Sequence, residues 1–392
     1  MMFLQYAIWG AWYPALSEYV TNTLGFSGVQ LGVLYMLLPL ANVLAPFIGG
    51  QLADRYFPTQ WVISFVQFVG GVLLIFMSRV TDYHTLMIMM LAYSILYSPT
   101  LALTNSIAMV NLENIEKDFG KIRVWGTLGW IGAGLTLSGW RYLAQGNMSF
   151  VYAGDTLLLA GIFSLIMGFQ ALTLPNTPPN KQASNPWAFL EALKMMKDRN
   201  FAVLIIIAFI VSTELMFYYV LTAPFLVTES IGVSRSGLTT VMALAQFAEI
   251  FVMALALPVV LPKYGIRKTM LIGILAWPVR YIIFAIGSPA WLVIASLTLH
   301  GFCYVFFFTV AQVYVDKAAP RDVRASAQSF IALVTLGVGN LIGSYFAGWV
   351  KDIFTDGDMV NWTGVFIVPT VLTILAGVLF LALFKDDRAA QA

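Results

Sequence analysis

Apolar stretches long enough to cross a lipid bilayer follow one another along the whole chain. A spanning helix needs about 20 apolar residues. Windows bounded by charged and turn residues give twelve such stretches: 2–22, 28–50, 60–79, 84–110, 122–144, 153–174, 201–228, 233–261, 267–287, 289–315, 325–349 and 362–384. Only 10% of the residues are charged, against about 25% in soluble domains. The pattern predicts an all-α membrane protein with twelve transmembrane helices.

The longest polar segment divides these stretches into two sets of six. Its first half is rich in Pro and Asn, and Trp187 to Lys197 has the pattern of a short amphipathic helix at the membrane surface. We therefore expect three parts: an N-terminal six-helix bundle (1–174), a cytoplasmic linker (175–200), and a C-terminal six-helix bundle with a short tail (201–392). Two such halves suggest a parallel repeat, as in the major facilitator fold.

Positive charge is distributed unevenly between the two sets of loops. One set carries 16 Lys and Arg residues and the other carries 4, while Arg280 lies inside an apolar stretch. Because Lys and Arg accumulate on the cytoplasmic side, both termini and the linker are predicted to be cytoplasmic. The expected location is the bacterial inner membrane, with the lipid bilayer as surroundings and the chain as a monomer.

Short outer loops and the absence of a soluble domain favour transport over catalysis. The single cysteine, Cys303, excludes an internal disulfide and a Cys-cluster metal site. No metal-ligand spacing, nucleophile–base pair or nucleotide-binding loop is visible. We expect no enzyme activity, no metal, no nucleic-acid partner and no cofactor other than a proton as the coupling ion. A membrane sensor or receptor is the remaining alternative.

Ionisable side chains inside the apolar stretches mark the most promising functional positions. Glu249 lies in the eighth stretch with Gln246 three residues earlier, on the same helical face. This pair predicts a polar pocket that binds a solute, moves protons, or both. Glu214 is a second intramembrane acid, and its alternatives are a structural hydrogen bond or an ion pair with Arg280. His300 titrates near neutral pH, so it can assist proton movement or serve as a structural hydrogen-bonding group.

The fifth stretch places a cation, a hydroxyl and an indole on one helical face. Arg123, Thr127 and Trp130 follow the i, i+4, i+7 spacing. Such a face suits a ligand with a polar part and a flat ring. In the alternative, Arg123 snorkels to the surface and Trp130 packs against lipid or core. The same spacing recurs in the first stretch, where Gln5 and Trp9 are weaker cavity candidates and Trp12 favours packing.

The segment GQLADRYF, between the second and third stretches, contains Gly50, Asp54 and Arg55. It matches the G-x-L-A-D-R signature of major facilitator transporters. Gly50 permits a tight cytoplasmic turn, and Asp54 can cap a helix or pair with the neighbouring bundle to hold one conformation closed. We expect these residues to act in conformational gating; the alternative is an ordinary charged loop.

Several segments together resemble the bacterial nucleoside:proton symporters of the major facilitator superfamily. They are FLQYAIWGAW, APFIGGQLADRYF, YSPTLALTNSIA, IRVWGTLGW, KYGIRKTMLIGILAWPVRY and VRASAQSF, with the Gln246/Glu249 pair. The resemblance implies a substrate bound between the two halves, with Arg123, Thr127 and Trp130 lining the cavity. It also implies that Gln246 and Glu249 contact the ribose and the base, and that Glu249 is a candidate for proton coupling.

The chain departs from the family at two of its helices. Met216 and Tyr219 stand where the seventh-span site has Gln and Asn. His300, Tyr304 and Val305 stand where the tenth-span site has Tyr, Phe and Asp. Substrate contacts are therefore expected from Tyr219, His300 and Tyr304, and proton coupling from Glu249, Glu214 or His300. A symporter or facilitator for sugars or other small polar solutes is the alternative function.

Overall fold

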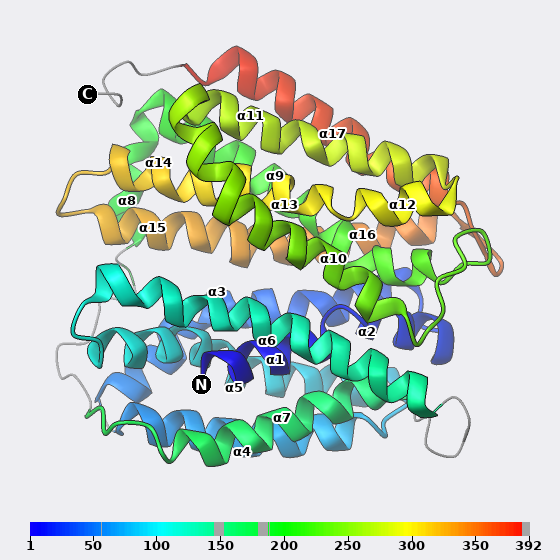
Figure 1. Ribbon diagram of the computed structural model, residues 1–392, viewed down its shortest axis with the longest axis horizontal. Coiled ribbons are helices and arrows are strands. Elements are labelled where there is room, and N and C mark those ends of the chain that lie inside the picture. Colours follow the sequence, from blue (N-terminus) through cyan, green and yellow to red (C-terminus); the bar gives the residue numbers. More distant parts are fainter. Residues whose placement is uncertain (56, 145–152, 179–186, 188, 386–392) are drawn as a thin grey trace. The chain divides into compact units, whose positions relative to one another are not determined.

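The computed structural model describes residues 1–55, 57–144, 153–178, 187 and 189–385, without the side chains of 46–55 and 115–117. Regular structure in these residues is helical except for one short hairpin (Figure 1). The N-terminal part contains α1 (Met2–Trp12), α2 (Leu16–Glu18), the π-helical turn η1 (Tyr19–Thr23), α3 (Gly28–Arg55), α4 (Thr59–Met77), α5 (Tyr83–Val110), α6 (Ile115–Ala144) and α7 (Asp155–Ala171).

The C-terminal part contains more helices because several are interrupted. The α-helices are α8 (Phe189–Ala192), α9 (Arg199–Leu226), α10 (Leu238–Phe251), α11 (Leu257–Ile286), α12 (Ala290–Ser296), α13 (Leu299–Cys303), α14 (Val310–Ala318), α15 (Arg324–Ala332), α16 (Asn340–Ile353) and α17 (Trp362–Leu383). The other elements are the 3₁₀ turn η3 (Leu193–Lys197), the π-helical turns η4 (Val252–Ala256), η5 (Tyr304–Thr309) and η6 (Leu333–Gly339), and the hairpin β1 (Thr355–Asp356) and β2 (Met359–Val360).

The all-helical membrane architecture predicted from the sequence is confirmed. Within the described residues, eight helical stretches are long and apolar enough to cross a membrane. The count of twelve spans stays a prediction. One continuous stretch, Leu238–Ile286, covers most of the eighth and all of the ninth predicted span. The chain changes direction inside it at Gly265, whose φ of 74° is open to glycine but costly for other residues.

Two local predictions were wrong. Helix α3 runs through Gly50 to Arg55, so the tight turn expected at Gly50 is absent. The amphipathic helix expected from Trp187 to Lys197 is reduced to the four residues of α8, followed by the 3₁₀ turn η3. Most of the rest of the predicted linker lies outside the described residues.

Polar side chains in the connections decide where several helices begin. Asp82 caps α5 by accepting hydrogen bonds from the amide and the hydroxyl of Thr85, both at 2.8 Å. These bonds hold the pKa of the Asp82 carboxyl below its ordinary value. Asp198 caps α9 and Asn361 caps α17 in the same way. Each cap satisfies an amide that the first helical turn leaves without a partner.

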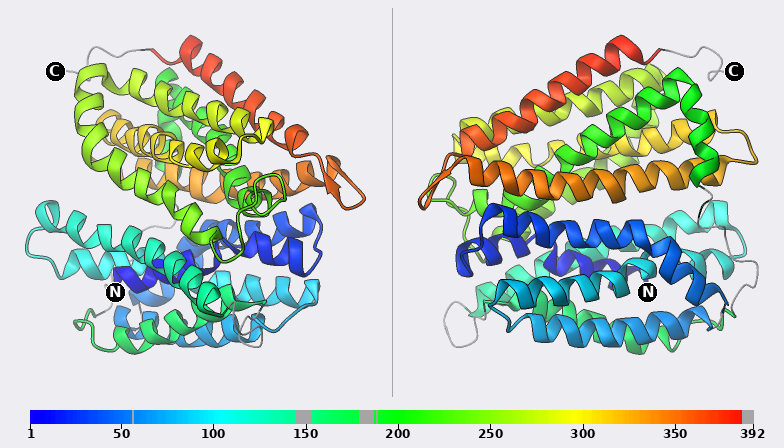
Figure 2. Two further views of the ribbon diagram at one scale, coloured as in Figure 1. Left: turned by 45° about the vertical axis from the view of Figure 1, so that its right-hand side comes forward. Right: turned by 180° about the vertical axis from the view of Figure 1, so that it is seen from behind.

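The chain forms two compact units. Unit 1 consists of residues 1–186 and 233–243, and unit 2 consists of residues 187–232 and 244–392. In unit 1 the packed helix pairs include α4 with α7, α1 with α6, α3 with α5, and α1 with α7. In unit 2 the corresponding pairs are α11 with α17, α9 with α16, and α9 with α17, which run side by side in Figure 2. The same pairing scheme therefore occurs twice along the chain.

Glycines allow α1 and α6 to approach each other closely. A Cβ atom on Gly129 would lie 2.0 Å from the main-chain oxygen of Phe3, and one on Gly10 would lie 2.7 Å from the Cα of Trp130. Because no side chain larger than hydrogen fits at either place, these positions set the distance between the two helices. That distance brings the aromatic residues of α1 against α6.

Buried charges hold the end of unit 1 where α6 leads toward α7. Arg141 binds Asp155 through two hydrogen bonds of 2.7 and 2.6 Å, and both side chains are almost fully buried. Glu18 pairs with Arg235 at 3.3 Å. Arg141 also donates to the main-chain oxygen of Arg235. The segment 233–243 is thus attached to unit 1 by charged groups, although it leads directly into α10.

Candidate functional site

One face of α1 and one face of α6 bring together an aromatic and cationic group of side chains in unit 1. The guanidinium of Arg123 lies 4.3 Å from the ring centroid of Tyr6. The rings of Trp9 and Trp130 meet edge to face with centroids 5.3 Å apart. Thr127 is half-buried and lies one turn from Arg123 on α6. The structure thus places Trp130 against Trp9 and Arg123 against Tyr6, with Thr127 on the same helix between Arg123 and Trp130.

Gln5 is not part of this face. Its amide nitrogen donates to the Thr100 hydroxyl at 2.7 Å, and its amide oxygen accepts from Gln67 at 3.0 Å. Its main-chain oxygen accepts from the Tyr97 hydroxyl. These bonds join α1 to α4 and α5 inside unit 1. The side chain is fully buried and fully used for structure.

Tyr6 is the residue that the sequence reasoning missed in unit 1. Tyr6, Trp9 and Tyr13 follow the i, i+3, i+7 spacing, which is as regular as the spacing of Gln5, Trp9 and Trp12. Trp12 is fully buried against Tyr13 instead of facing Trp130. The sequence signal that could have identified this face is that Tyr6, Trp9 and Tyr13 are all aromatic.

In unit 2, His300 lies at the centre of a cluster of aromatic rings. Its imidazole stacks on Tyr218 with ring centroids 4.6 Å apart. The rings of Tyr304 and Tyr219 lie 5.7 and 6.2 Å from it. Three of the predicted contacts, Tyr219, His300 and Tyr304, are therefore brought together by α9, α13 and η5.

Gln246 and Glu249 lie next to the same cluster. Gln246 is buried and Glu249 is half-buried on α10. Both side chains are close enough to the Tyr218 hydroxyl to interact with it. The predicted pair therefore adjoins the residues around His300, and it adds a carboxylate and an amide to a region made mainly of rings.

The possible ion pair between Glu214 and Arg280 is not present. Both carboxylate oxygens of Glu214 are buried and have no hydrogen-bond partner among the described residues. Arg280 is also fully buried, but its Nη1 lies 3.2 Å from Nδ1 of His300. The guanidinium rests on aromatic rings, because Trp277 and Tyr218 each have their centroid 4.5 Å from its central carbon. Cation–π contacts with aromatic rings therefore hold the charge of Arg280, in place of the ion pair with Glu214.

The importance of α11 was underestimated from the sequence. Trp277, Arg280, Tyr281 and Phe284 follow the i, i+3, i+4, i+7 pattern of one helical face, and the structure buries all of them. Arg280 was considered only as a partner for Glu214. The sequence signal for this arrangement is that Trp277, Tyr281 and Phe284 lie on the same helical face as Arg280.

Val305 occupies apolar surroundings. It is fully buried in a cluster with Val252 and Phe306. No described polar group takes the place of a carboxylate in that cluster. This leaves Glu249 and Glu214 as the acids near the ring cluster.

The predicted gating residues lie in the last turns of α3. Helix α3 includes Gly50, Asp54 and Arg55. Their side chains lie outside the described part of the chain, so their gating role stays a prediction.

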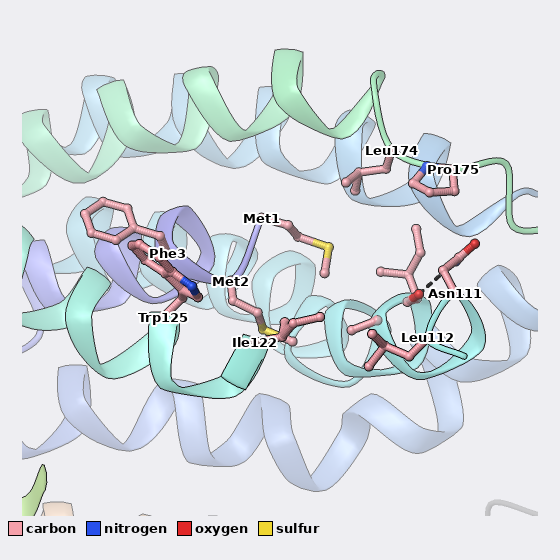
Figure 3. Close-up of a pocket in the computed structure, with 11 residues that line it drawn as sticks. Met1, Met2, Phe3, Asn111, Leu112, Ile122, Trp125, Leu174 and Pro175 are labelled. Atoms are coloured by element: carbon pink, nitrogen blue, oxygen red, sulfur yellow. Dashed lines mark hydrogen bonds between the residues drawn. The ribbon is translucent and has the colours of Figure 1, made fainter. Parts of the chain in front are cut away.

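A cavity of about 450 Å³ in unit 1 is separate from these residues. Met1, Met2 and Phe3 line one side, and Ile107, Ala108, Asn111, Leu112, Ile122, Trp125, Leu174 and Pro175 line the remainder (Figure 3). The lining is mostly apolar, and the Asn111 amide is already bonded to the Ile107 oxygen and the Thr177 hydroxyl. None of the predicted binding residues contributes to this cavity.

Comparison with known proteins gives consistent matches over the whole chain. A family model described as "Nucleoside H+ symporter" matches residues 1–389. The putative nucleoside transporter YegT of Escherichia coli is 35% identical over 403 residues, covering 99% of this chain and 93% of the relative. The nucleoside permease NupG of Escherichia coli is 29% identical, covering 98% and 94%. The crystal structure of the nucleoside transporter NupG superposes with a TM-score of 0.87 at 28% identity, covering 98% of both chains.

Proposed function

The chain belongs to the nucleoside H+ symporter family, and on that premise we propose that it imports nucleosides together with protons. It is a multi-pass transporter of the bacterial inner membrane and not an enzyme. Transport proceeds by alternating access, the general mechanism of the major facilitator fold. The observation that carries the proposal is the family match along residues 1–389, together with an aromatic, hydrogen-bonding group of side chains in each unit.

We propose that the substrate contacts come from both units. The indoles of Trp130 and Trp9 offer flat faces to the base, while Arg123 and Thr127 offer donors to polar groups. In unit 2 the contacts are Gln246, Glu249, Tyr219, Tyr304 and His300. Gln5 supports α1 through its hydrogen bonds rather than through the ligand.

We propose that proton coupling comes from one of three candidates in unit 2, Glu249, Glu214 or His300. Glu249 is half-buried beside the Tyr218 hydroxyl, where a bound solute can reach it. Glu214 is fully buried without a partner among the described residues. A carboxylate is costly at such depth unless it is paired or protonated, so either acid can link proton binding to a conformational change.

The remaining topology follows from the repeated helix pairing and the charge bias. We propose twelve spans arranged as two six-helix bundles, with both termini in the cytoplasm and the chain acting as a monomer in the lipid bilayer. Gly50, Asp54 and Arg55 are proposed to act in gating at the cytoplasmic end of α3. A reporter fused to the C-terminus and active only in the cytoplasm tests the orientation.

A carrier for sugars is the second candidate, favoured by the departures at Met216, Tyr219 and Val305. Thermal unfolding of the purified protein in detergent separates the two. We expect nucleosides to raise the melting temperature and mono- and disaccharides to leave it unchanged. Stabilisation by a sugar and by no nucleoside would refute the nucleoside assignment.

A further inference from the structure

The surroundings of His300 fix the orientation of its ring. The imidazole is fully buried and stacks on Tyr218 at an interplanar angle of 25°. Trp277 meets it edge to face with centroids 6.2 Å apart, and Tyr304 and Tyr219 close the remaining sides. A ring packed in this way has little freedom to turn over. Each of its two nitrogens therefore points in a defined direction.

Arg280 determines which of these nitrogens carries the proton. Its Nη1 lies 3.2 Å from Nδ1 of His300. A guanidinium N–H can only donate, so Nδ1 must accept. An imidazole that accepts at Nδ1 is neutral and carries its proton on Nε2. Protonating Nδ1 would break this bond and place a second positive charge beside the guanidinium.

The same aromatic rings hold Arg280 in place. Its central carbon lies 4.5 Å from the ring centroids of Tyr218 and Trp277, and 5.2 Å from that of Tyr281. Cation–π contacts are strongest where water is excluded, and Arg280 is fully buried. Within the described residues no carboxylate pairs with it. The guanidinium thus contacts the rings and His300, while its Nε and Nη2 are buried without a hydrogen-bond partner among the described residues.

The other imidazole nitrogen, Nε2, is the unexplained group. It is buried and has no hydrogen-bond partner among the described residues. A buried donor without an acceptor is unfavourable, which points to an acceptor supplied by a ligand. Two rings that contact the imidazole, those of Tyr219 and Tyr304, are only half-buried, so the cluster is partly accessible where these two side chains lie.

We propose that Arg280 is a positioning residue that holds His300 as a neutral Nε2–H donor, and that this donor selects nucleosides whose base carries a carbonyl oxygen. The proposal rests on the function proposed above. Nε2 is itself buried, so an exocyclic oxygen that projects from the base reaches it better than a flat ring edge. An exocyclic amino group at that position would point its N–H groups at the Nε2–H of His300, and two donors cannot form a hydrogen bond.

Two purine nucleosides test this choice. Inosine has a carbonyl at C6 and a hydrogen on N1, whereas purine riboside has hydrogen at C6 and an acceptor at N1, so the His300 variants are needed to assign a preference to the carbonyl. Binding to the purified full chain is measured by calorimetry or by competition. We expect wild type to bind inosine about tenfold more tightly, the effect of one hydrogen bond. His300→Gln, which keeps an N–H near the Nε2 position, should retain the preference, and His300→Asn should lose it.

The positioning role of Arg280 has a separate readout in the pH dependence. In Arg280→Met the neutral imidazole is free to place its proton on either nitrogen, so inosine binding should be weaker than wild type at pH 8. The imidazole stays buried in this variant, and burial disfavours its charged form. Protonation of both nitrogens, which restores the Nε2–H donor, therefore requires a pH well below about 6.5, the ordinary value of imidazole. We therefore expect inosine affinity to recover toward wild type at low pH in Arg280→Met, and not in Arg280→Met/His300→Gln.

Arg280→Met and Arg280→Met/His300→Gln differ only at position 300, so the contributions of the other ionisable groups near His300 cancel in this comparison. The groups that face it are Arg280 and Tyr281 on α11, Tyr218, Tyr219 and Glu214 on α9, Glu249 on α10, and Tyr304 on η5.

If Arg280→Met does not fold, Arg280→Lys and the two His300 variants still decide the question. Lysine retains a cationic donor, so the inosine preference should persist within about threefold of wild type. Equal affinities of wild type for inosine and purine riboside, or equal preferences in His300→Gln and His300→Asn, would overturn the inference. Saturable uptake of both nucleosides would then leave the proposed function intact, whereas no uptake of any nucleoside would refute that function itself.

Discussion

At the scale of single residues, a shift of one position along α1 changes which side chains form the face toward α6. The spacing of Gln5, Trp9 and Trp12 predicted one face, and the structure uses Tyr6, Trp9 and Tyr13 instead. Trp9 belongs to both series, so spacing alone does not separate them. The choice depends on partners far away in the sequence, such as Thr100, which binds the Gln5 amide. Such partners are not visible from one helix.

Tyr6 is expected to matter through its ring, because the guanidinium of Arg123 lies over it. Tyr6→Leu removes the ring and should weaken nucleoside binding about fivefold, the effect of a cation–π contact of about 1 kcal/mol. Tyr6→Phe keeps the ring and should bind like wild type. Competition against uptake of a labelled nucleoside measures both. An equal loss in the two variants would assign the effect to the hydroxyl.

Glu249 was predicted from the cost of an acid inside an apolar stretch, and the structure places it beside the Tyr218 hydroxyl. Glu249→Gln has nearly the same shape but cannot release a proton. We expect it to abolish accumulation driven by a pH gradient while exchange of labelled for unlabelled nucleoside across liposomes persists. Uphill accumulation by the variant would remove Glu249 as the coupling acid and leave Glu214.

At the scale of elements, the positions of the helices were predictable because apolar length is a strong signal in a membrane. Their interruptions were not. The π-helical turns η4, η5 and η6 lie inside apolar sequence. Such turns depend on how neighbouring helices pack, which a single stretch does not encode. The break at Gly265 is different, because it falls in the charged segment where the sequence predicted the loop between the eighth and ninth spans. The end of α3 was misplaced because a glycine tolerates helix as well as turn.

Two glycines on α6 provide a matched test of the packing between α1 and α6. Gly129→Ala would place a methyl group 2.0 Å from the Phe3 oxygen, whereas Gly139→Ala would meet nothing within 4 Å. We expect Gly129→Ala to lower stability by about 1–3 kcal/mol through overpacking. Gly139→Ala should be neutral or stabilising by up to about 1 kcal/mol. Melting temperatures in one detergent measure both, and equal values would contradict the close approach.

At the scale of the whole molecule, the same scheme of helix pairs occurs twice along the chain. The polar segment near the middle of the chain predicted two halves, and the helix pairs α4–α7 and α1–α6 recur as α11–α17 and α9–α16. The boundary between the units is less simple than the sequence indicated. Residues 233–243 belong to unit 1, because Arg235 and Thr239 bind groups of α2 and α6. Contacts made after the chain has folded back are not visible in a linear pattern.

The account as a whole depends on nucleosides and protons moving together. The most direct measurement is accumulation of a labelled nucleoside by the purified protein in liposomes, with and without an inward proton gradient. We predict accumulation above the external concentration only when the gradient is present, and collapse of that accumulation when an ionophore dissipates it. Accumulation that does not respond to the gradient, or no nucleoside transport in either condition, would contradict the account.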